Sequence, residues 1–514
     1  MENKKKTLRI ISLITMILMA LCIVIFAIVL INFNVFPPVY IAIAIIVLIL
    51  IFEVVFFLRK KSTVPGIISI VVSLIMSIIL AISSYYIFAT DKTLKTITDE
   101  GYDILVYKVV VMADDKAESI ADAAGYKFGT ISSFEKSDFS DAIVLLNEAA
   151  QTEVSRTDYD GIGAMMEDFY DGKVQALFYE GALGGILGDM NENYYLDTKI
   201  IGEITIKKAA EAGTLPGGVA EAETKEPEEE TPIAAEEIVI EPFVVLISGS
   251  DEYFDVSVTG RCDVSMLAVV NFETRQILLV SIPRDYYVKF PHITGDDRDK
   301  LTHAGIYGIH IHTMTLEELF DIDIDYYIRV NFTSVVDIIN VIGGITIYNP
   351  YAFSTTYYDL YYGEGEMWLD GWESLQYARE RKSLPDGDIS RGEHQQIIIE
   401  AMVDKLVSIS SIANYTKFLD VINRCAITNM SESFIKSVAK KQLDEGGGWE
   451  IVKSQAMGTS ASMPSYAAGG EELFVIVPDE DSVRQTAELI KRVLAGEIVD
   501  SQVSAEGTAT DEDS

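Results

Sequence analysis

Three long apolar segments at the start of the chain constrain its fold more than any other feature. They cover residues 10–33, 39–58 and 67–88. Each has about 20 mostly apolar residues, the length that crosses roughly 30 Å of hydrocarbon. A cleavable signal peptide has a single short apolar core, whereas two further apolar segments follow the first one here. The sequence therefore predicts a membrane anchor over residues 1–90 with three transmembrane helices.

The positions of basic residues predict how this anchor is oriented. Lysines and an arginine occur at positions 4–6 and 9, before the first segment, and again at positions 59–61, while the turn at 34–38 is uncharged. Basic loops stay in the cytoplasm. We therefore expect a three-pass plasma-membrane protein with a cytoplasmic amino terminus, and we expect everything after residue 88 to be extracellular.

The overall charge limits the partners that the extracellular part can bind. The 514 residues carry a formal net charge of −38, and binding a nucleic-acid backbone requires a basic face, so no nucleic-acid partner is expected. Three cysteines do not form a disulfide framework. Cys22 lies in the first apolar segment, and Cys262 and Cys425 either pair in the oxidising exterior or remain separate thiols.

Composition divides the extracellular part into regions. Residues 91–209, with strand candidates at 104–112 and 200–206 and a helix candidate at 138–150, predict a small α/β accessory domain. Its segment 171–187 weakly resembles a lobe of bacterial solute-binding proteins, and a passive spacer is the alternative. Residues 210–239 predict an acidic disordered linker, and residues 498–514 a disordered acidic tail.

The region 240–497 is predicted to be a larger domain. Its strand candidates are 243–248, 265–271, 277–283, 326–331 and 473–477, and its helix candidates are 316–320, 332–341, 389–408 and 481–494. Several strands are apolar on both faces, which is typical of a sheet covered by helices on each side. The predicted fold class is α/β, with an α/β/α sandwich as the architecture of this domain.

Arginines and aspartates gather at the ends of these strands. Asp251 follows the first strand, Arg261 and Asp263 precede the second, and Arg284 and Asp285 follow the third, where Pro283 ends the ladder. We expect these side chains to emerge at strand termini.

A second group of polar side chains lies in the sequence ARERKSLPDGDISRGEHQQ. In an extended segment Arg379 and Arg381 share one face, whereas Arg391 and Gln395 share a helical face. Asp388 precedes Arg391 by three positions and is expected to cap that helix.

This combination of residue types favours a pyrophosphate site. Guanidinium groups bind phosphate oxygens in bidentate fashion, and aspartates hold Mg²⁺, or Mn²⁺ as an alternative, which bridges phosphates. The alternative is that the same groups form surface ion pairs, each worth about 0 to 1 kcal/mol. Five arginines in so acidic a chain favour the pyrophosphate site.

Six stretches of this region resemble successive motifs of the LytR-CpsA-Psr family. They are VLISGSD, RCDVSMLAVVNFETRQILLVSIPRD, DKLTHA, IDIDYYIRVNF, IGGITI and ARERKSLPDGDISRGEHQQ, and they span about residues 240–490. The resemblance implies an extracellular phosphotransferase of Gram-positive bacteria. Such an enzyme moves a glycopolymer, usually teichoic acid or capsular polysaccharide, from a polyprenyl-pyrophosphate carrier to peptidoglycan.

The resemblance also implies roles for individual residues. Asp251 and Asp263 match metal ligands, Gln395 and Asp388 match supporting polar positions, and Lys300 matches a basic residue near the head group. The pyrophosphate-binding arginines correspond to Arg261, Arg284, Arg379, Arg381 and Arg391. The family threads the polyprenyl tail into an apolar tunnel, for which 332–342 and 397–406 are candidates, with plain core as the alternative for each residue.

This chain departs from the family pattern at three positions. Cys262 replaces a serine, Thr302 replaces an asparagine, and His394 replaces an arginine. None of these changes removes a matched metal or pyrophosphate residue, so they affect acceptor and head-group details rather than the reaction.

The mechanistic hypothesis is a phosphoryl transfer to a sugar hydroxyl. Mg²⁺ and arginines, with Arg284 and Arg391 foremost, neutralise the pyrophosphate while a peptidoglycan hydroxyl attacks the phosphorus next to the glycopolymer. Asp263 or Asp285 takes the hydroxyl proton. A polyprenyl-pyrophosphate phosphatase is one rival. The other is a membrane sensor or transcriptional attenuator, which needs a cytoplasmic DNA-reading domain that the sequence does not predict.

Overall fold

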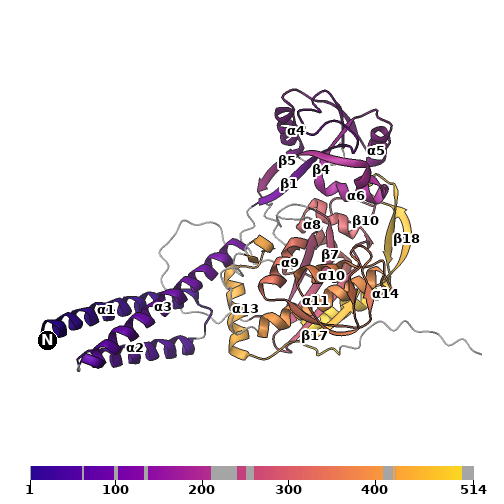
Figure 1. Cartoon of the computed structure of the whole chain (residues 1–514). Coiled ribbons are helices and arrows are strands. Elements are labelled where there is room, and N and C mark those ends of the chain that lie inside the picture. The colour runs from indigo at the N-terminus through magenta and orange to yellow at the C-terminus, as the bar shows by residue number, and fades with distance from the viewer. Residues whose placement is uncertain are drawn as a thin grey trace, which may run out of the picture.

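The computed structural model describes residues 2–36, 38–60, 63–97, 102–131, 137–209, 240–250, 260–408, 421–422 and 424–500. Along the chain it contains three long helices, a small α/β unit from β1 to β5 and a larger α/β unit from β6 to α14 (Figure 1). The predicted linker, most of the predicted tail and Asp251 lie outside the described residues.

The three long helices are α1 (Glu2–Phe33), α2 (Pro38–Lys60) and α3 (Thr63–Ile97). Each contains a stretch long and apolar enough to cross a membrane, which confirms the three predicted apolar helices. Small polar side chains join them: the Ser12 and Ser69 hydroxyls lie 3.2 Å apart, and Ser69 also donates to the Val55 carbonyl at 3.2 Å. Such residues allow close helix packing in lipid.

The small unit is a five-stranded sheet with helices, in the strand order β3-β2-β4-β1-β5. Its elements include the strand, helix and closing strand expected from the sequence, so the small α/β architecture is confirmed. In chain order they are β1 (Tyr102–Met112), β2 (Lys127–Ile131), α4 (Ser137–Ala150), β3 (Ser155–Tyr159), α5 (Ile162–Tyr170), β4 (Ala176–Glu180), α6 (Gly184–Met190), α7 (Tyr194–Asp197) and β5 (Thr198–Ala209).

A six-stranded sheet forms the centre of the larger unit, in the order β16-β11-β6-β7-β8-β17. Strand β7 runs antiparallel to its neighbours β6 and β8, whereas β11 is parallel to β6 and β17 is parallel to β8. The strands are β6 (Phe243–Ser250), β7 (Cys262–Asn271), β8 (Gln276–Ile282), β11 (Tyr326–Asn331), β16 (Ile427–Thr428) and β17 (Glu450–Gln455).

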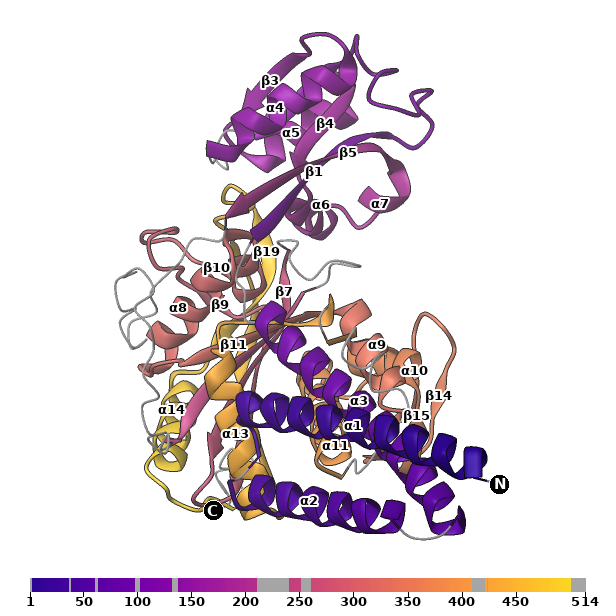
Figure 2. The same cartoon turned by 90° about the vertical axis from the view of Figure 1, so that its left-hand side faces the viewer.

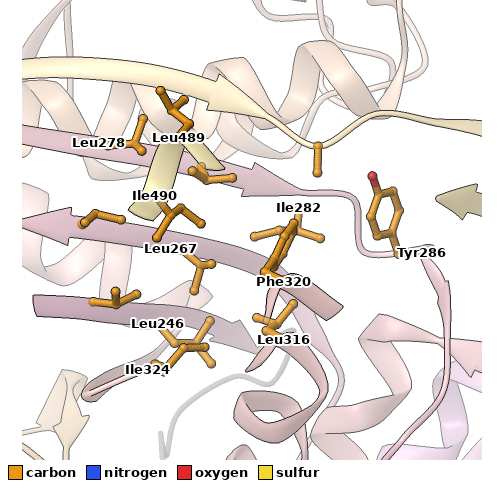
Figure 3. Packing of buried hydrophobic residues seen from close by; sticks show 14 of the residues in the cluster. Leu246, Leu267, Leu278, Ile282, Tyr286, Leu316, Phe320, Ile324, Leu489 and Ile490 are labelled. Atoms are coloured by element: carbon orange, nitrogen blue, oxygen red, sulfur yellow. The ribbon is translucent and has the colours of Figure 1, made fainter. Parts of the chain in front are cut away.

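Helices cover both faces of this sheet because its strands are apolar on both sides. Leu246, Leu267 and Leu278, one from each antiparallel strand, pack against α8 (Ile309–Phe320) and α14 (Glu480–Leu494) (Figure 3). On the other face, Leu279 and its neighbours meet α11 (Asp388–Ser408) and α13 (Glu432–Glu445). The predicted α/β/α sandwich is confirmed.

One predicted strand does not belong to the central sheet. β19 (Glu472–Pro478) pairs with β18 (Gly458–Pro464) in a two-stranded ribbon, and an isolated parallel bridge joins its Ile476 to Tyr286. Its side chains alternate between buried and exposed along Leu473–Val475, which fits a ribbon with one covered face better than a central strand.

Short elements complete the larger unit beside this sheet. They are β9 (Tyr287–Val288), β10 (Asp299–Lys300), a 3₁₀ helix (Leu301–Tyr307), α9 (Phe332–Val341), β12 (Ile345–Asn349), β13 (Phe353–Ser354), β14 (Tyr361–Tyr362), β15 (Gly365–Leu369) and α10 (Gly371–Arg379). Ile339, Ile342, Ile398 and Ala401 share a buried core here. These four tunnel candidates therefore have core roles in this structure, and the tunnel itself stays a prediction.

The N-terminus of α10 is fixed by a capping box, and its capping residue offers a stability prediction. The Asp370 carboxylate accepts from the backbone N–H of Glu373 at 2.8 Å, and the Glu373 carboxylate accepts from the backbone N–H of Asp370 at 3.0 Å. Asp370→Ala should lower the free energy of unfolding by about 1 kcal/mol. Thermal unfolding of the purified chain measures this change. Asp370→Ser, which keeps an acceptor, should stay near the wild type, and equal losses in both variants would contradict the capping account.

The larger unit contacts both the long helices and the small unit. Lys436 of α13 lies 2.5 Å from Asp91 of α3, and its ammonium group lies 5.0 Å from the centre of the Phe33 ring of α1. Figure 2 shows the small unit stacked on one end of the larger unit, with the long helices beside the larger unit. The ends of α1 and α3 that contact Lys436 thus lie next to the larger unit.

Candidate anion-binding site

The site begins where two antiparallel strands place charged residues side by side. Asp263 is the second residue of β7, and Arg284 follows the end of β8. Because Ser265 pairs with Ile282, the start of β7 lies beside the end of β8. Arg284 Nη1 donates to Asp263 Oδ1 at 2.9 Å, and the two side chains are only 10% and 14% exposed.

Asp263 is held in its charged form. Burial alone would raise its pKa, but the positive charges of Arg284, Arg261 and Arg391 outweigh burial and hold the pKa well below its ordinary value. Thr302 adds a hydrogen bond from its hydroxyl to Asp263 Oδ1 at 3.1 Å. The Asp263 carboxylate thus interacts with cations from several segments of the chain.

Arg391 joins this cluster from α11. Its Nη2 lies 2.6 Å from Asp388 Oδ1. Burial lowers its pKa, while the charges of Asp388, Asp263 and Asp285 act in the opposite direction. Asp388 is the first residue of the helix rather than the residue before it. The predicted cap is therefore corrected: Asp388 lies one position too far into the helix, and its carboxylate pairs with Arg391.

Asp285 connects Arg284 to Lys300. Arg284 Nε lies 3.7 Å from one oxygen of Asp285, and Lys300 Nζ lies 3.5 Å from the other. The second oxygen, Oδ1, is buried and accepts no hydrogen bond from the described residues. The opposing carboxylates Asp263 and Asp285 together raise the pKa of Arg284 against the effect of burial.

The accessory unit contributes a further carboxylate. Asp189, near the end of α6, accepts from Lys300 Nζ at 3.1 Å and lies 3.8 Å from Arg261 Nη1. Burial would raise the pKa of Asp189, but Lys300 and Arg261 hold it below its ordinary value. Sequence reasoning missed this residue, because no local pattern shows that a helix of one domain will reach the cations of another.

The remaining predicted arginines occupy different surroundings. Arg379 is the last residue of α10, and its guanidinium lies 4.4 Å from the centre of the Phe332 ring. Arg381 follows the helix, and its backbone N–H donates to the Glu380 carboxylate at 3.0 Å. The prediction that Arg379 and Arg381 share one face of an extended segment is wrong, since Arg379 ends a helix.

Gln395 lies on the same helix as Arg391, as predicted, and donates to the Ala378 carbonyl at 3.4 Å. In the part of the chain that the structure describes, no hydrogen bond or ion pair joins Gln395 or Arg381 to Asp263. Their roles at a pyrophosphate stay predictions.

Two of the departures from the family pattern lie in the core. His394 stacks on Tyr377, with ring centres 4.1 Å apart, and burial lowers its pKa to about 4, so it is neutral at pH 7. Cys262 and Cys425 are both buried, and neither forms a disulfide within the described residues. Of the two alternatives for these cysteines, the structure shows separate thiols.

A buried hydrogen-bond network is centred on Asp299, the residue before Lys300. Asp299 contacts His303 Nδ1 at 2.8 Å, and it accepts from the Ser465 hydroxyl at 2.6 Å and from the Ala467 N–H at 2.8 Å. This network ties the β10 turn to the segment between β18 and β19. It was also missed, because Asp299 and Ser465 are 166 residues apart in sequence.

The chemistry of Asp263 suits a divalent cation. Within the described residues both hydrogen bonds to Asp263 end on Oδ1, which leaves Oδ2 for a hard cation such as Mg²⁺. The described residues contain no group of three or more histidine, cysteine or acidic side chains placed to hold a metal. Asp263 therefore fits as one ligand, and the second predicted ligand, Asp251, is not described.

The fold and the site together define a class of protein. It is an α/β/α protein with apolar helices at its amino terminus and a cluster of arginines and aspartates at the ends of its central strands. Residues 217–478 match the LytR_cpsA_psr family. The chain belongs to this family, which confirms the resemblance seen in its motifs.

Curated relatives share the same region. The chain is 35% identical over 221 residues to the polyisoprenyl-teichoic acid–peptidoglycan teichoic acid transferase TagU of Enterococcus faecalis, a match covering 43% of this chain and 71% of that protein. It is 37% identical over 193 residues to TagU of Bacillus subtilis, covering 37% of this chain and 61% of that protein. The crystal structure of B. subtilis TagU is 28% identical, covers 51% of this chain and 100% of that chain, and has a TM-score of 0.40.

Proposed function

We propose that this chain transfers a cell-wall glycopolymer, of the teichoic acid or capsular polysaccharide class, from a polyprenyl-pyrophosphate carrier to peptidoglycan. The observation that carries the proposal is the convergence of Arg284, Arg391 and Lys300 around Asp285, which is buried, and Asp263, which is largely buried. Family membership and relatives named as teichoic acid transferases support it.

The cations of the site bind and orient the diphosphate. Guanidinium groups that cannot lose their charge form charge-assisted hydrogen bonds to phosphate oxygens. In a buried site these bonds stabilise the negative charge on the oxygens of the transferred phosphoryl group. Arg284 and Arg391 come from different elements but act on the same carboxylate, so they are placed to hold one ligand group.

In the proposed reaction a sugar hydroxyl of peptidoglycan forms a new P–O bond to the phosphorus next to the glycopolymer. The P–O bond to the bridging oxygen breaks, and polyprenyl phosphate leaves. The hydroxyl proton passes to a carboxylate. Asp285 is the better candidate for this role, because its Oδ1 accepts no hydrogen bond in the described residues, whereas Asp263 is held strongly ionised by three arginines.

Mg²⁺, or Mn²⁺ in its place, is proposed as the metal. Asp263 and Asp251 would hold the ion, which would supply further neutralisation of phosphate charge. The membrane is proposed as a third partner beside the lipid carrier and peptidoglycan. The amino terminus is cytoplasmic and the catalytic domain extracellular, as the basic loops indicate.

A reconstituted transfer reaction tests the proposal. The purified full-length chain in lipid nanodiscs is given a labelled glycopolymer on a polyprenyl-pyrophosphate carrier and peptidoglycan as acceptor. We expect label in the insoluble wall fraction, linked by a phosphodiester, with loss in EDTA and recovery on addition of Mg²⁺. Release of free polymer with no wall-linked product would instead identify a phosphatase, and unchanged transfer in EDTA would remove the metal from the account.

A further inference from the structure

Helix α6 of the accessory unit lies against the cations of the proposed pyrophosphate site. Asp189 pairs with Lys300 at 3.1 Å and with Arg261 at 3.8 Å. A Cβ added at Gly185 of the same helix would lie 2.3 Å from the Arg261 guanidinium, so the Arg261 side chain packs directly against the backbone of α6. The contact is therefore a close fit between two units rather than a loose encounter.

A shared hydrophobic core holds α6 in place. Ile162 and Leu187 of the accessory unit belong to the same buried cluster as Ile306, Ala467 and Leu473 of the larger unit. Separating the two units would expose this core to water, at roughly 25 cal/mol for each Å² of apolar surface. The shared core therefore holds the backbone of α6 beside the cations, whereas the Asp189 side chain is partly exposed to solvent.

Asp189 belongs to a series of ion pairs in which carboxylates and cations alternate. Asp263 contacts Arg284, Arg284 contacts Asp285, and Asp285 contacts Lys300, which contacts Asp189 and through it Arg261. Lys300 is 5% exposed and Arg261 is 13% exposed, whereas the Asp189 side chain is 26% exposed. Among these charged side chains, the Asp189 carboxylate from the accessory unit is the most accessible to water.

Asp189 is also the member whose position matches that of a ligand anion. A carboxylate oxygen between an ammonium and a guanidinium group makes the contacts that a phosphate oxygen makes in a phosphate site. Asp263 and Asp285 come from the strand ends that build the site, but Asp189 reaches it from another domain.

We propose that the Asp189 carboxylate occupies the place of a phosphate group at Lys300 and Arg261, and that a diphosphate ligand must displace it. This inference rests on the proposed function and adds to it a residue that sets ligand affinity. A rotation of one partly exposed side chain is sufficient for the displacement, so the shared core stays intact. The accessory unit would thereby select ligands whose negative charge at this position exceeds that of one carboxylate.

Binding of inorganic pyrophosphate to the full-length chain tests this inference. Isothermal titration calorimetry on the purified protein in detergent compares the wild type with Asp189→Asn, which keeps the shape but removes the charge. If Asp189 occupies the position about nine-tenths of the time, its neutralisation should lower the Kd about tenfold. Asp189→Glu, which keeps the charge, should remain within about twofold of the wild type on the same reasoning.

Glu192 provides a matched control, because it is an exposed carboxylate three residues further along. Glu192→Gln should leave the Kd unchanged, which separates displacement from a general change in surface charge. Pyrophosphate should also raise the melting temperature of Asp189→Asn more than that of the wild type. An equal or higher Kd for Asp189→Asn would overturn the inference and would identify Asp189 as a support for the cations.

A further variant separates this inference from the proposed function. Arg391→Ala should lose pyrophosphate binding if the arginines form the site. If Arg391→Ala binds weakly while Asp189→Asn binds like the wild type, only the displacement is wrong. If neither variant differs from the wild type, pyrophosphate does not bind at this cluster, and the proposed function fails as well.

Discussion

Replacing Arg391 with alanine should lower the rate of glycopolymer transfer by about 10³-fold, because it removes a buried cation whose charge acts on Asp263 and Asp285. Arginines that stabilise phosphoryl-transfer transition states contribute effects of about this size. The initial rate of labelled polymer transfer to peptidoglycan measures the loss. Arg391→Lys should recover only part of the rate, since an ammonium group cannot bind two phosphate oxygens in the same fork geometry.

The chain supplies a matched control for this substitution. Arg484 pairs with Asp481 at 2.7 Å with the same three-residue spacing at a helix start, but its side chain is 63% exposed. Arg484→Ala should transfer polymer at the wild-type rate. If Arg391→Ala did so too, the arginine cluster would have no part in catalysis.

Replacing Asp263 with alanine should lower the free energy of unfolding by about 3 to 5 kcal/mol, the usual cost of leaving a buried charge without its partner. Arg284 would lose its 2.9 Å contact, and the Thr302 hydroxyl would lose its acceptor. Chemical denaturation of the purified chain measures the change. The double variant Asp263→Ala with Arg284→Met should be more stable than Asp263→Ala alone, because it removes the buried cation that has lost its closest partner.

The same aspartates predict how stability depends on pH. The pKa values of Asp263, Asp189 and Asp299 are all lowered in the folded chain. Their contribution to the stability of the folded chain is therefore fully present above the unfolded carboxyl pKa of about 4. It is lost as the pH falls further toward the pKa values of the folded chain. The melting temperature should fall steeply below about pH 4, and less steeply in Asp263→Asn. Equal slopes in both proteins would contradict the assigned ion pair.

The sequence predicted those parts of the site that depend on neighbouring strands. Asp263 and Arg284 were expected at strand ends, and they meet because an antiparallel pair brings the start of β7 to the end of β8. The apolar strands predicted a sheet covered on both faces for the same local reason. Lys300 was found only through the family resemblance, since no strand pattern points to it.

The features that were missed or wrong depend on distant contacts. Asp189 reaches the site only because two units share a core, and Asp299 is buried by a turn from another part of the chain. Arg379 was expected in an extended segment, but the capping box at Asp370 starts a helix that continues to Arg379. Leu473 is buried, yet its strand forms a ribbon with β18 outside the central sheet. Local patterns do not fix these pairings.

The most direct test of the central claim is an experimental structure of the full-length chain with a short-chain polyprenyl pyrophosphate and Mg²⁺. We expect both phosphate groups to contact Arg284, Arg391 and Lys300, and we expect the metal to be bound by Asp263. The Asp189 side chain should be rotated away from Lys300. A ligand bound elsewhere, with the ion pairs from Asp263 to Asp189 unchanged, would contradict it.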